Sequence, residues 1–215
     1  MIKDLTMFVI PVINEKYFDE VVKKIELIEP HSDWVQIDIG DGVFTPNLTW
    51  NNPGDLLKLK SNISIEMHLM IRNPEEAIEN WLKIPQIKRA VIHLEGMTDL
   101  NKIMEAAKKY QKEIGLAINP ETPWEALKPY LEKINFIQIL AVKPGLASQK
   151  FNPEIINKIK SLRGFKKDVI IEVDGGVTLE NATLLKEEGA DILNSATYIF
   201  DSPNIKEAID ALENI

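Results

Sequence analysis

The chain has 215 residues, and its 25 Lys and Arg against 33 Asp and Glu give a formal net charge of −8 at pH 7. This length suits one domain, or at most two, with a substantial core, and the negative charge argues against nucleic acid as a general partner. The chain has no cysteine, which excludes disulfides and thiolate metal sites and fits a cytoplasmic protein. The apolar run near the amino terminus is interrupted by Pro11 and is too short to span a bilayer, and we expect no membrane partner.

Eight short apolar runs rich in Ile and Val predict strands along the chain. They begin at Met7, Trp34, Ile63, Arg89, Ile114, Ile134, Asp168 and Asp191. Segments with apolar residues at helical spacing lie between them and predict helices. These segments are 17–28, 74–82, 100–110, 123–131, 153–162, 179–188 and 205–212, and the weaker segment 55–60 predicts only a short helix.

The alternation of strands and helices predicts the fold class. A repeat of about 27 residues suits a βα unit, and eight such units close into a (β/α)8 TIM barrel. An open doubly wound sheet is the alternative, but it usually has fewer strands at this length and a glycine-rich phosphate loop after its first strand. The first predicted strand is followed by NEKYF, without glycine. We therefore expect residues 1–215 to form a single α/β barrel domain.

The second predicted strand carries polar side chains where a strand should bury apolar ones. Alternation puts Gln36 and Asp38 on the face opposite Val35, Ile37 and Ile39. A buried carboxylate is costly unless it is paired, hydrogen-bonded or bound to a metal. Asp38 is therefore either a structural hydrogen-bond acceptor or a working acid or base, and the strand alone favours neither.

The carboxyl ends of the strands hold the active residues of a barrel. The polar residues there are Asp38, His68, His93, Asn119, Lys143 and Asp174. Asp38, His68 and Asp174 are predicted to face one axis, where two carboxylates can move protons on opposite faces of a carbon next to a carbonyl. The enediolate that forms must be stabilised, and a divalent metal bound by these three side chains would do so.

Two further inward side chains, Glu66 and Glu172, are predicted to support this group. Alternation places Glu66 on the face of His68 and Glu172 on the face of Asp174, one layer lower. Hydrogen bonds from these glutamates would orient the site. His93 lies one strand further round, and we interpret it as a hydrogen-bonding residue of the core.

Glycine-rich turns after the seventh and eighth strands form the common phosphate site of barrels. Gly175 and Gly176 precede a predicted helix start, where backbone N–H groups and the helix terminus favour an anion. Gly145 lies in the loop after the sixth strand, and residues 195–197 offer hydroxyls and amides after the eighth. The three loops together predict a phosphate site.

Five motifs carry a family resemblance: IDIGDGVFTPNLT, MHLMIRNP, INPETP, VKPGLASQKF and IEVDGGV. In this order and spacing the sequence resembles the ribulose-phosphate 3-epimerase family along nearly the whole chain. The resemblance implies a (β/α)8 TIM barrel of the ribulose-phosphate-binding type. It implies that this barrel epimerises a ketopentose 5-phosphate at C3 through an enediolate, interconverting ribulose 5-phosphate and xylulose 5-phosphate or a related pair. It implies that Asp38 and Asp174 are the acid/base groups, and that Asp38, His68 and Asp174 bind a divalent metal, which is Zn, Mn, Fe or Mg. The phosphorylated ketose would be bound by His68, Gly145, Leu146, Ala147, Ser148, Gly175, Gly176, Ala196 and Thr197.

The chain departs from the usual pattern of this family at several site positions. Gln36 stands where the family usually has a histidine as a fourth metal ligand, and an amide oxygen is a poorer zinc ligand than imidazole. Gly40 and Leu140 stand where methionines usually cap the enediolate region. Other departures are Val12 and Glu15 near the positions of serines, Ala147 in the phosphate loop, and Ala196 and Thr197 in place of Gly-Ser. These changes leave the metal, the substrate and turnover itself open.

Two other functions remain as alternatives at this point. A catalytically altered phosphosugar-binding barrel that lacks the usual metal is motivated by Gln36. A decarboxylase on the same barrel would resemble an Asp-x-Lys-x-x-Asp pattern at the second strand, but the segment from Asp38 to Asp41 has no lysine. The loop that carries Asn47 and Trp50 is also a candidate contact between the subunits of a homo-oligomer.

Overall fold

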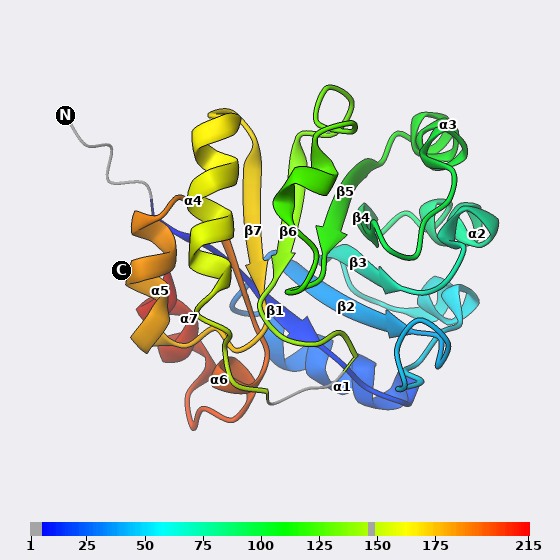
Figure 1. Cartoon of the computed structure of the whole chain (residues 1–215). Coiled ribbons are helices and arrows are strands. Elements are labelled where there is room, and N and C mark those ends of the chain that lie inside the picture. Colours follow the sequence, from blue (N-terminus) through cyan, green and yellow to red (C-terminus); the bar gives the residue numbers. More distant parts are fainter. Residues whose placement is uncertain (1–5, 146–148) are drawn as a thin grey trace.

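Eight parallel strands close into a barrel in the computed structural model, which describes residues 6–145 and 149–215 (Figure 1). The strands pair in chain order, and β1 pairs with β8 to close the barrel. Their bounds are β1 Phe8–Ile13, β2 Trp34–Gly40, β3 Ser64–Met70, β4 Ile87–His93, β5 Glu113–Ile118, β6 Phe136–Leu140, β7 Ile170–Asp174 and β8 Ile192–Ser195. The expected (β/α)8 fold is confirmed, and each predicted apolar run overlaps one strand. Leu146, Ala147 and Ser148, which were expected to bind phosphate, lie outside the described residues.

Helices surround this barrel (Figure 1). The α-helices are α1 Phe18–Ile28, α2 Ile78–Leu82, α3 Leu100–Tyr110, α4 Ile155–Phe165, α5 Leu179–Glu187, α6 Thr197–Phe200 and α7 Ile205–Glu213, and the 3-10 helices are η1 Pro53–Lys58, η2 Pro74–Glu76 and η3 Trp124–Leu127. The structure differs from the prediction in the segment 123–131, where only η3 forms. Lys128 keeps helical backbone angles, but Pro129 has no amide hydrogen to donate to the preceding turn, which interrupts the hydrogen bonds of a continuous helix.

The interior of the barrel holds an apolar cluster beside a polar layer. The cluster is made of Ile10, Val91, Ala117, Phe136 and Ile192. The polar layer is made of Gln36, Glu66, Gln138 and Glu172, which are fully buried. Buried polar groups are costly unless they are paired, and the contacts of this polar layer therefore decide how the site above it is held.

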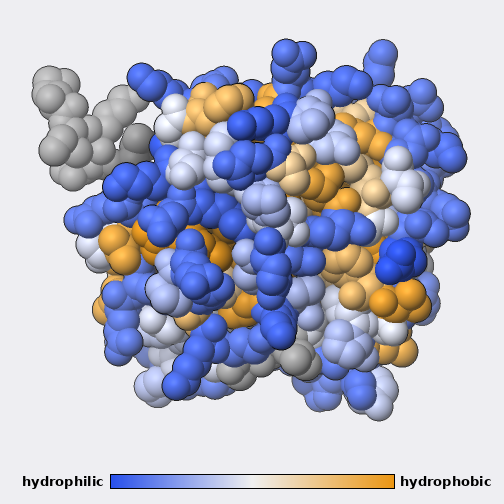
Figure 2. All heavy atoms as spheres, viewed as in Figure 1, coloured by the Kyte–Doolittle hydropathy of each residue, from blue (hydrophilic) through white to orange (hydrophobic). Residues whose placement is uncertain are grey.

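Hydrophilic residues cover most of the face of the molecule shown in Figure 2. Large apolar side chains that are exposed include Tyr17, Val43, Leu48 and Leu57. Within residues 6–145 and 149–215, no helix has both the length and the apolar character that crossing a membrane requires.

Candidate active site

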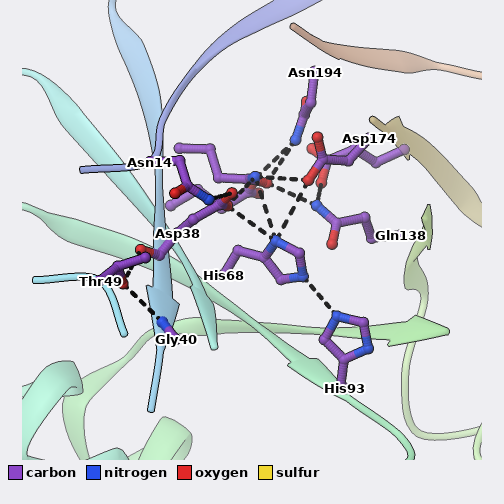
Figure 3. Close-up of polar contacts among 12 residues, drawn as sticks. Asn14, Asp38, Gly40, Thr49, His68, His93, Gln138, Asp174 and Asn194 are labelled. Carbon is purple, nitrogen blue, oxygen red and sulfur yellow. Dashed lines mark hydrogen bonds and ion pairs between the residues drawn. The ribbon is translucent and has the colours of Figure 1, made fainter. Parts of the chain in front are cut away.

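Two aspartates and a histidine from three strands meet at the carboxyl end of the barrel (Figure 3). Asp38 on β2 lies in register with His68 on β3, and Asp174 is the last residue of β7. Nδ1 of His68 lies 3.1 Å from Oδ1 of Asp38 and 3.4 Å from Oδ2 of Asp174. The exposed fractions of Asp38, His68 and Asp174 are 8%, 0% and 7%. The structure thus brings together the two residues predicted as acid/base groups and the histidine predicted beside them.

This group of three side chains fits a divalent metal ion. Each side chain offers one ligand atom, and these atoms all lie within 4.8 Å of one another. The spacings of 3.1 and 3.4 Å from Nδ1 of His68 to the two aspartates are those of atoms that share one ion at roughly 2.0–2.2 Å. Two carboxylates and an imidazole form a donor set that several divalent metals accept, and the identity of the metal does not follow from it.

Gln36 is fully buried beside the same three side chains, with its amide nitrogen toward them. Its Nε2 donates to Oδ1 of Asp38 over 2.8 Å and to Oδ2 of Asp174 over 2.9 Å. Its Oε1 accepts hydrogen bonds from Gln138 and Asn194, each over 2.7 Å. The oxygen, which is the atom of Gln36 expected to bind a metal, therefore faces away from the group that would hold one.

Three residues of the site escaped the sequence reasoning. Asn14, just after β1, donates through Nδ2 to Oδ2 of Asp38 over 2.9 Å (Figure 3). Gln138 and Asn194 donate to the oxygen of Gln36. A signal for Asn14 was present, because it is the first polar residue after the first apolar run. Gln138 and Asn194 carried a weaker signal, as inward polar positions of the sixth and the eighth strand.

Burial and hydrogen bonding shift the protonation of His68 and Asp174. Burial alone would lower the pKa of His68, but its hydrogen bonds with Asp174 and Asp38 raise that pKa to about 10. Burial raises the pKa of Asp174, and the negative charge of Asp38 adds to this, against hydrogen bonds with His68 and Gln36 that lower it. A carboxyl group with a raised pKa in a cavity is typical of acid/base catalysts.

His93 supports the ring of His68 from the side away from the aspartates. The Nε2 atoms of the two rings lie 2.9 Å apart, and Nδ1 of His93 lies 3.2 Å from Oε2 of Glu95. Burial lowers the pKa of His93 to about 4, although its hydrogen bond with Glu95 acts in the opposite direction. Glu95 in turn accepts a hydrogen bond from the backbone N–H of Asn119 over 2.8 Å. These contacts agree with the interpretation of His93 as a hydrogen-bonding residue of the core.

The two glutamates expected one layer below, Glu66 and Glu172, contact the site indirectly, through the side-chain amides of other residues. Nε2 of Gln138 donates to Oε1 of Glu172 over 2.9 Å as well as to Gln36, and Nδ2 of Asn194 lies 3.4 Å from Oε1 of Glu66. Burial raises the pKa of both glutamates, and for Glu172 the charge of Glu66 raises it further. The lower layer therefore orients Gln36 first, and through Gln36 the two aspartates.

A cavity of about 530 Å³ opens onto this site. Its volume lies within the range of cavities that bind small molecules. Asp38, His68 and Asp174 line it, together with the described residues of the expected phosphate loops, which are Gly145, Gly175, Gly176, Ala196 and Thr197. Lys143 lines it too, whereas Asn119 does not.

The turn after β7 needs glycine for its backbone conformation. Gly175 has φ +104° and Gly176 has φ +66°, both in the left-handed region. A Cβ atom on Gly175 would also lie 2.5 Å from the side chain of Val142. The turn ends where α5 begins at Leu179, which gives the strand, turn and helix order of a barrel phosphate site.

The loop expected to contact another subunit has its partners within the chain. Trp50 is 6% exposed, and its ring packs against those of Phe18 and Trp81. Nδ2 of Asn47 donates to the backbone oxygen of Gly145 over 2.6 Å, which joins the loop after β2 to the loop after β6. These two residues therefore give no support to a subunit contact, and a homo-oligomer stays a prediction.

Comparison with known proteins identifies the family. The family model described as the ribulose-phosphate 3 epimerase family matches residues 9–200. The chain belongs to this family. Ribulose-phosphate 3-epimerase of Chlamydia pneumoniae is 36% identical over 191 residues, which cover 85% of this chain and 82% of that protein. Ribulose-phosphate 3-epimerase of Helicobacter pylori strain J99 is 31% identical over 216 residues, covering 97% of this chain and 98% of that protein.

Solved structures show the same fold at lower identity. The crystal structure of 3-hexulose-6-phosphate synthase from Salmonella typhimurium is 14% identical, with a TM-score of 0.74 over 96% of this chain and 97% of that chain. This likeness concerns the barrel alone. The family assignment rests on the sequence match, and it makes this epimerase-family chain an isomerase of sugar phosphates.

Three of the departures of this epimerase-family chain, at Gly40, Val12 and Leu140, have a visible consequence in the structure. A Cβ atom on Gly40 would lie 2.6 Å from the backbone oxygen of Asn47, and the loop after β2 therefore occupies the space that a side chain at position 40 would need. Val12 and Leu140 both line the cavity with apolar side chains; the resemblance expects a serine near position 12 and a methionine at position 140.

Proposed function

We propose that this chain interconverts ketopentose 5-phosphates by epimerisation at C3, with ribulose 5-phosphate and xylulose 5-phosphate, or a related pair, as substrates. One observation carries the proposal: Asp38 and Asp174 reach the same cavity from β2 and β7 and share Nε2 of Gln36 as a partner, at 2.8 and 2.9 Å. Two carboxylates so close together can serve one carbon of a bound sugar. Cytoplasmic action is part of the proposal, since a cysteine-free chain suits a reducing compartment.

In this mechanism the two aspartates take complementary roles. One carboxylate removes the proton from C3, next to the carbonyl at C2, and leaves an enediolate. The other aspartate, with its proton in place, returns a proton to the opposite face of C3, which inverts the configuration. The raised pKa of Asp174 suits it to hold a proton before transfer. A divalent ion, when Asp38, His68 and Asp174 hold one, would add to the stabilisation of the negative charge on the enediolate.

The rest of the cavity would orient the substrate. The turn at Gly175 and Gly176, with Ala196 and Thr197 beside it, lines the cavity and would bind the phosphate. Gly145 would contribute from the loop after β6, and His68 would contact the sugar from below. A phosphate fixed at one end of the cavity leaves C3 of the sugar between the carboxylates, because the reacting carbon must stay within contact distance of both.

Isotope exchange tests the proposed reaction directly. Purified protein is incubated with ribulose 5-phosphate in deuterated water, with and without added divalent metal, and the products are followed by NMR. We expect deuterium at C3 and accumulation of xylulose 5-phosphate. If no ketopentose 5-phosphate exchanges its C3 hydrogen under either condition, the chain is a phosphosugar-binding barrel without this activity.

The roles of the two aspartates are tested by Asp38→Asn and Asp174→Asn. Each substitution keeps the shape of the side chain and removes its ability to exchange a proton. We expect each variant to lose roughly two to four orders of magnitude in kcat. Circular dichroism checks that the variants fold, and near-normal turnover by a folded variant would contradict the role of that aspartate.

A further inference from the structure

The amide of Gln36 stands among the three side chains that would bind a metal. Its Nε2 lies 2.8 Å from Asp38, 2.9 Å from Asp174 and 3.4 Å from Nδ1 of His68. The first two contacts have hydrogen-bond length, and an amide nitrogen carries two hydrogens, one for each carboxylate. Gln36 therefore links Asp38 on β2 to Asp174 on β7 through one group.

The neighbours of Gln36 fix which end of the amide faces the aspartates. Its oxygen accepts from Nε2 of Gln138 and from Nδ2 of Asn194. Nε2 of Gln138 also donates to Oε1 of Glu172. An inward oxygen on Gln36 would set its own N–H2 group against two other N–H2 groups, so three amides would have to turn together. When Gln36 donates to the aspartates, each N–H2 group in this set faces an oxygen.

We propose that Gln36 is a positioning residue that holds the two acid/base carboxylates together by hydrogen bonds, in the place where the resemblance implies a fourth metal ligand. This inference rests on the function proposed above. Two adjacent carboxylates repel each other, and a positive group between them offsets that repulsion. The N–H2 group supplies partial positive charge at both oxygens, and it does so without an ion.

Two consequences follow for metal binding. An ion entering between Asp38, His68 and Asp174 must displace the Gln36 nitrogen from both carboxylates. It also gains no fourth ligand from Gln36 unless the amides of Gln138 and Asn194 turn as well. The wild-type chain should therefore bind divalent ions weakly, and turnover should persist when metal is removed.

The test compares metal content in wild-type protein and in Gln36→His, which exchanges the amide for an imidazole. Gln111→His is the matched control, because it adds a histidine at an exposed position that ends α3. Each protein is incubated with Zn²⁺ or Mn²⁺, desalted, and analysed for bound metal by mass spectrometry. We expect about one ion per chain in Gln36→His only. Chelator should lower the epimerase rate of that variant roughly tenfold or more and leave the wild-type rate unchanged.

Gln36→Leu provides a second measurement that does not depend on how Gln36→His folds. Leucine keeps the volume and removes both N–H groups, so kcat should fall roughly tenfold or more while KM stays near the wild-type value. A wild-type protein that retains one tightly bound ion and loses its activity in chelator would overturn the inference. So would a Gln36→Leu variant with unchanged kcat.

The two proposals fail in different ways. A wild-type chain with no epimerase activity under any condition refutes the proposed function, while the metal contents of the wild type and Gln36→His still decide whether the amide or an ion joins the carboxylates. An active wild type that requires its bound metal refutes the role of Gln36 alone.

Discussion

Both oxygens of Asp38 are held by side chains, from β2 itself, from β3 and from the residue after β1. Oδ1 contacts Nε2 of Gln36 at 2.8 Å and Nδ1 of His68 at 3.1 Å, and Oδ2 accepts from Nδ2 of Asn14 over 2.9 Å. A carboxylate held on both sides keeps one orientation toward its substrate, which lowers the entropic cost of proton transfer. Asn14 is thus the residue that completes the orientation of Asp38 from β1.

The variant Asn14→Ala tests this role. Removing the donor leaves Oδ2 of Asp38 without its protein partner, and we expect kcat to fall about tenfold with a smaller change in KM. Asn157→Ala, at an exposed position of α4, is the control and should behave as wild type. Steady-state kinetics with the sugar phosphate gives both constants, and an unchanged kcat would remove Asn14 from the site.

At the scale of elements, one side chain connects α5 to the glycine turn before it. Oδ1 of Asn181 accepts a hydrogen bond from the backbone N–H of Thr178 over 3.0 Å, and its Nδ2 donates to the backbone oxygen of Gly176 over 2.9 Å. The first contact caps the helix and the second fixes the turn. The start of α5 and the shape of the proposed phosphate loop therefore depend on the same residue.

Asn181→Ala should therefore lower both stability and substrate binding. Loss of the cap should cost about 1 kcal/mol of unfolding free energy, and loss of the hydrogen bond to Gly176 should raise KM several-fold. Asn204→Ala is a matched control, because Asn204 caps α7 through Glu207 outside the cavity. Urea unfolding and kinetics on both variants separate the effects. Equal KM values in the two variants would show that the hydrogen bond from Asn181 to Gly176 has no role in substrate binding.

The strands were predictable because their signal is local. Runs of Ile and Val identified all eight strands, and the rule for strand ends identified Asp38, His68 and Asp174. Residues 123–131 were predicted as a helix from apolar spacing, but Pro129 limits that segment to η3. α6 has four residues, too few to show a helical period.

The orientation of Gln36 was beyond sequence reasoning for a different reason. Its oxygen is held by Gln138 and Asn194, which lie 102 and 158 residues further along the chain. Which end of an amide faces a carboxylate depends on such distant partners, and these meet only when the barrel closes. Sequence alone therefore suggested a weak oxygen ligand at a position where the structure has a hydrogen-bond donor.

At the scale of the whole molecule, Arg89 connects strands across the interior of the barrel. From β4 its guanidinium group pairs with Glu66 on β3, with Glu113 on β5 at 3.1 Å and with Glu172 on β7 at 3.8 Å. It also lies over the ring of Phe136, 3.7 Å from the centroid. One cation thus compensates two fully buried glutamates, and these same glutamates contact the amides below the active site.

Arg89→Met tests how far this cation supports the molecule. Without it Glu66 and Glu172 remain buried together, and we expect a loss of roughly 3–5 kcal/mol of unfolding free energy. Burial raises the pKa of both glutamates above their value in the unfolded chain. The folded state therefore binds more protons than the unfolded state from about pH 4.5 upward. As a result, the contribution of these two groups to the free energy of unfolding falls as pH rises.

The free energy of unfolding of Arg89→Met should accordingly be higher near pH 5 than near pH 8, and this difference should be larger than in the wild type. Urea unfolding of both proteins at the two pH values measures the difference. Glu113→Gln is the control, because the Glu113 side chain is 47% exposed and its loss should cost little. Adding Glu66→Gln and Glu172→Gln to Arg89→Met should recover stability and flatten the pH dependence, since no buried charge is then left uncompensated. An Arg89→Met variant that loses the same stability at both pH values would show that Arg89 acts through its packing on Phe136 and not through its charge.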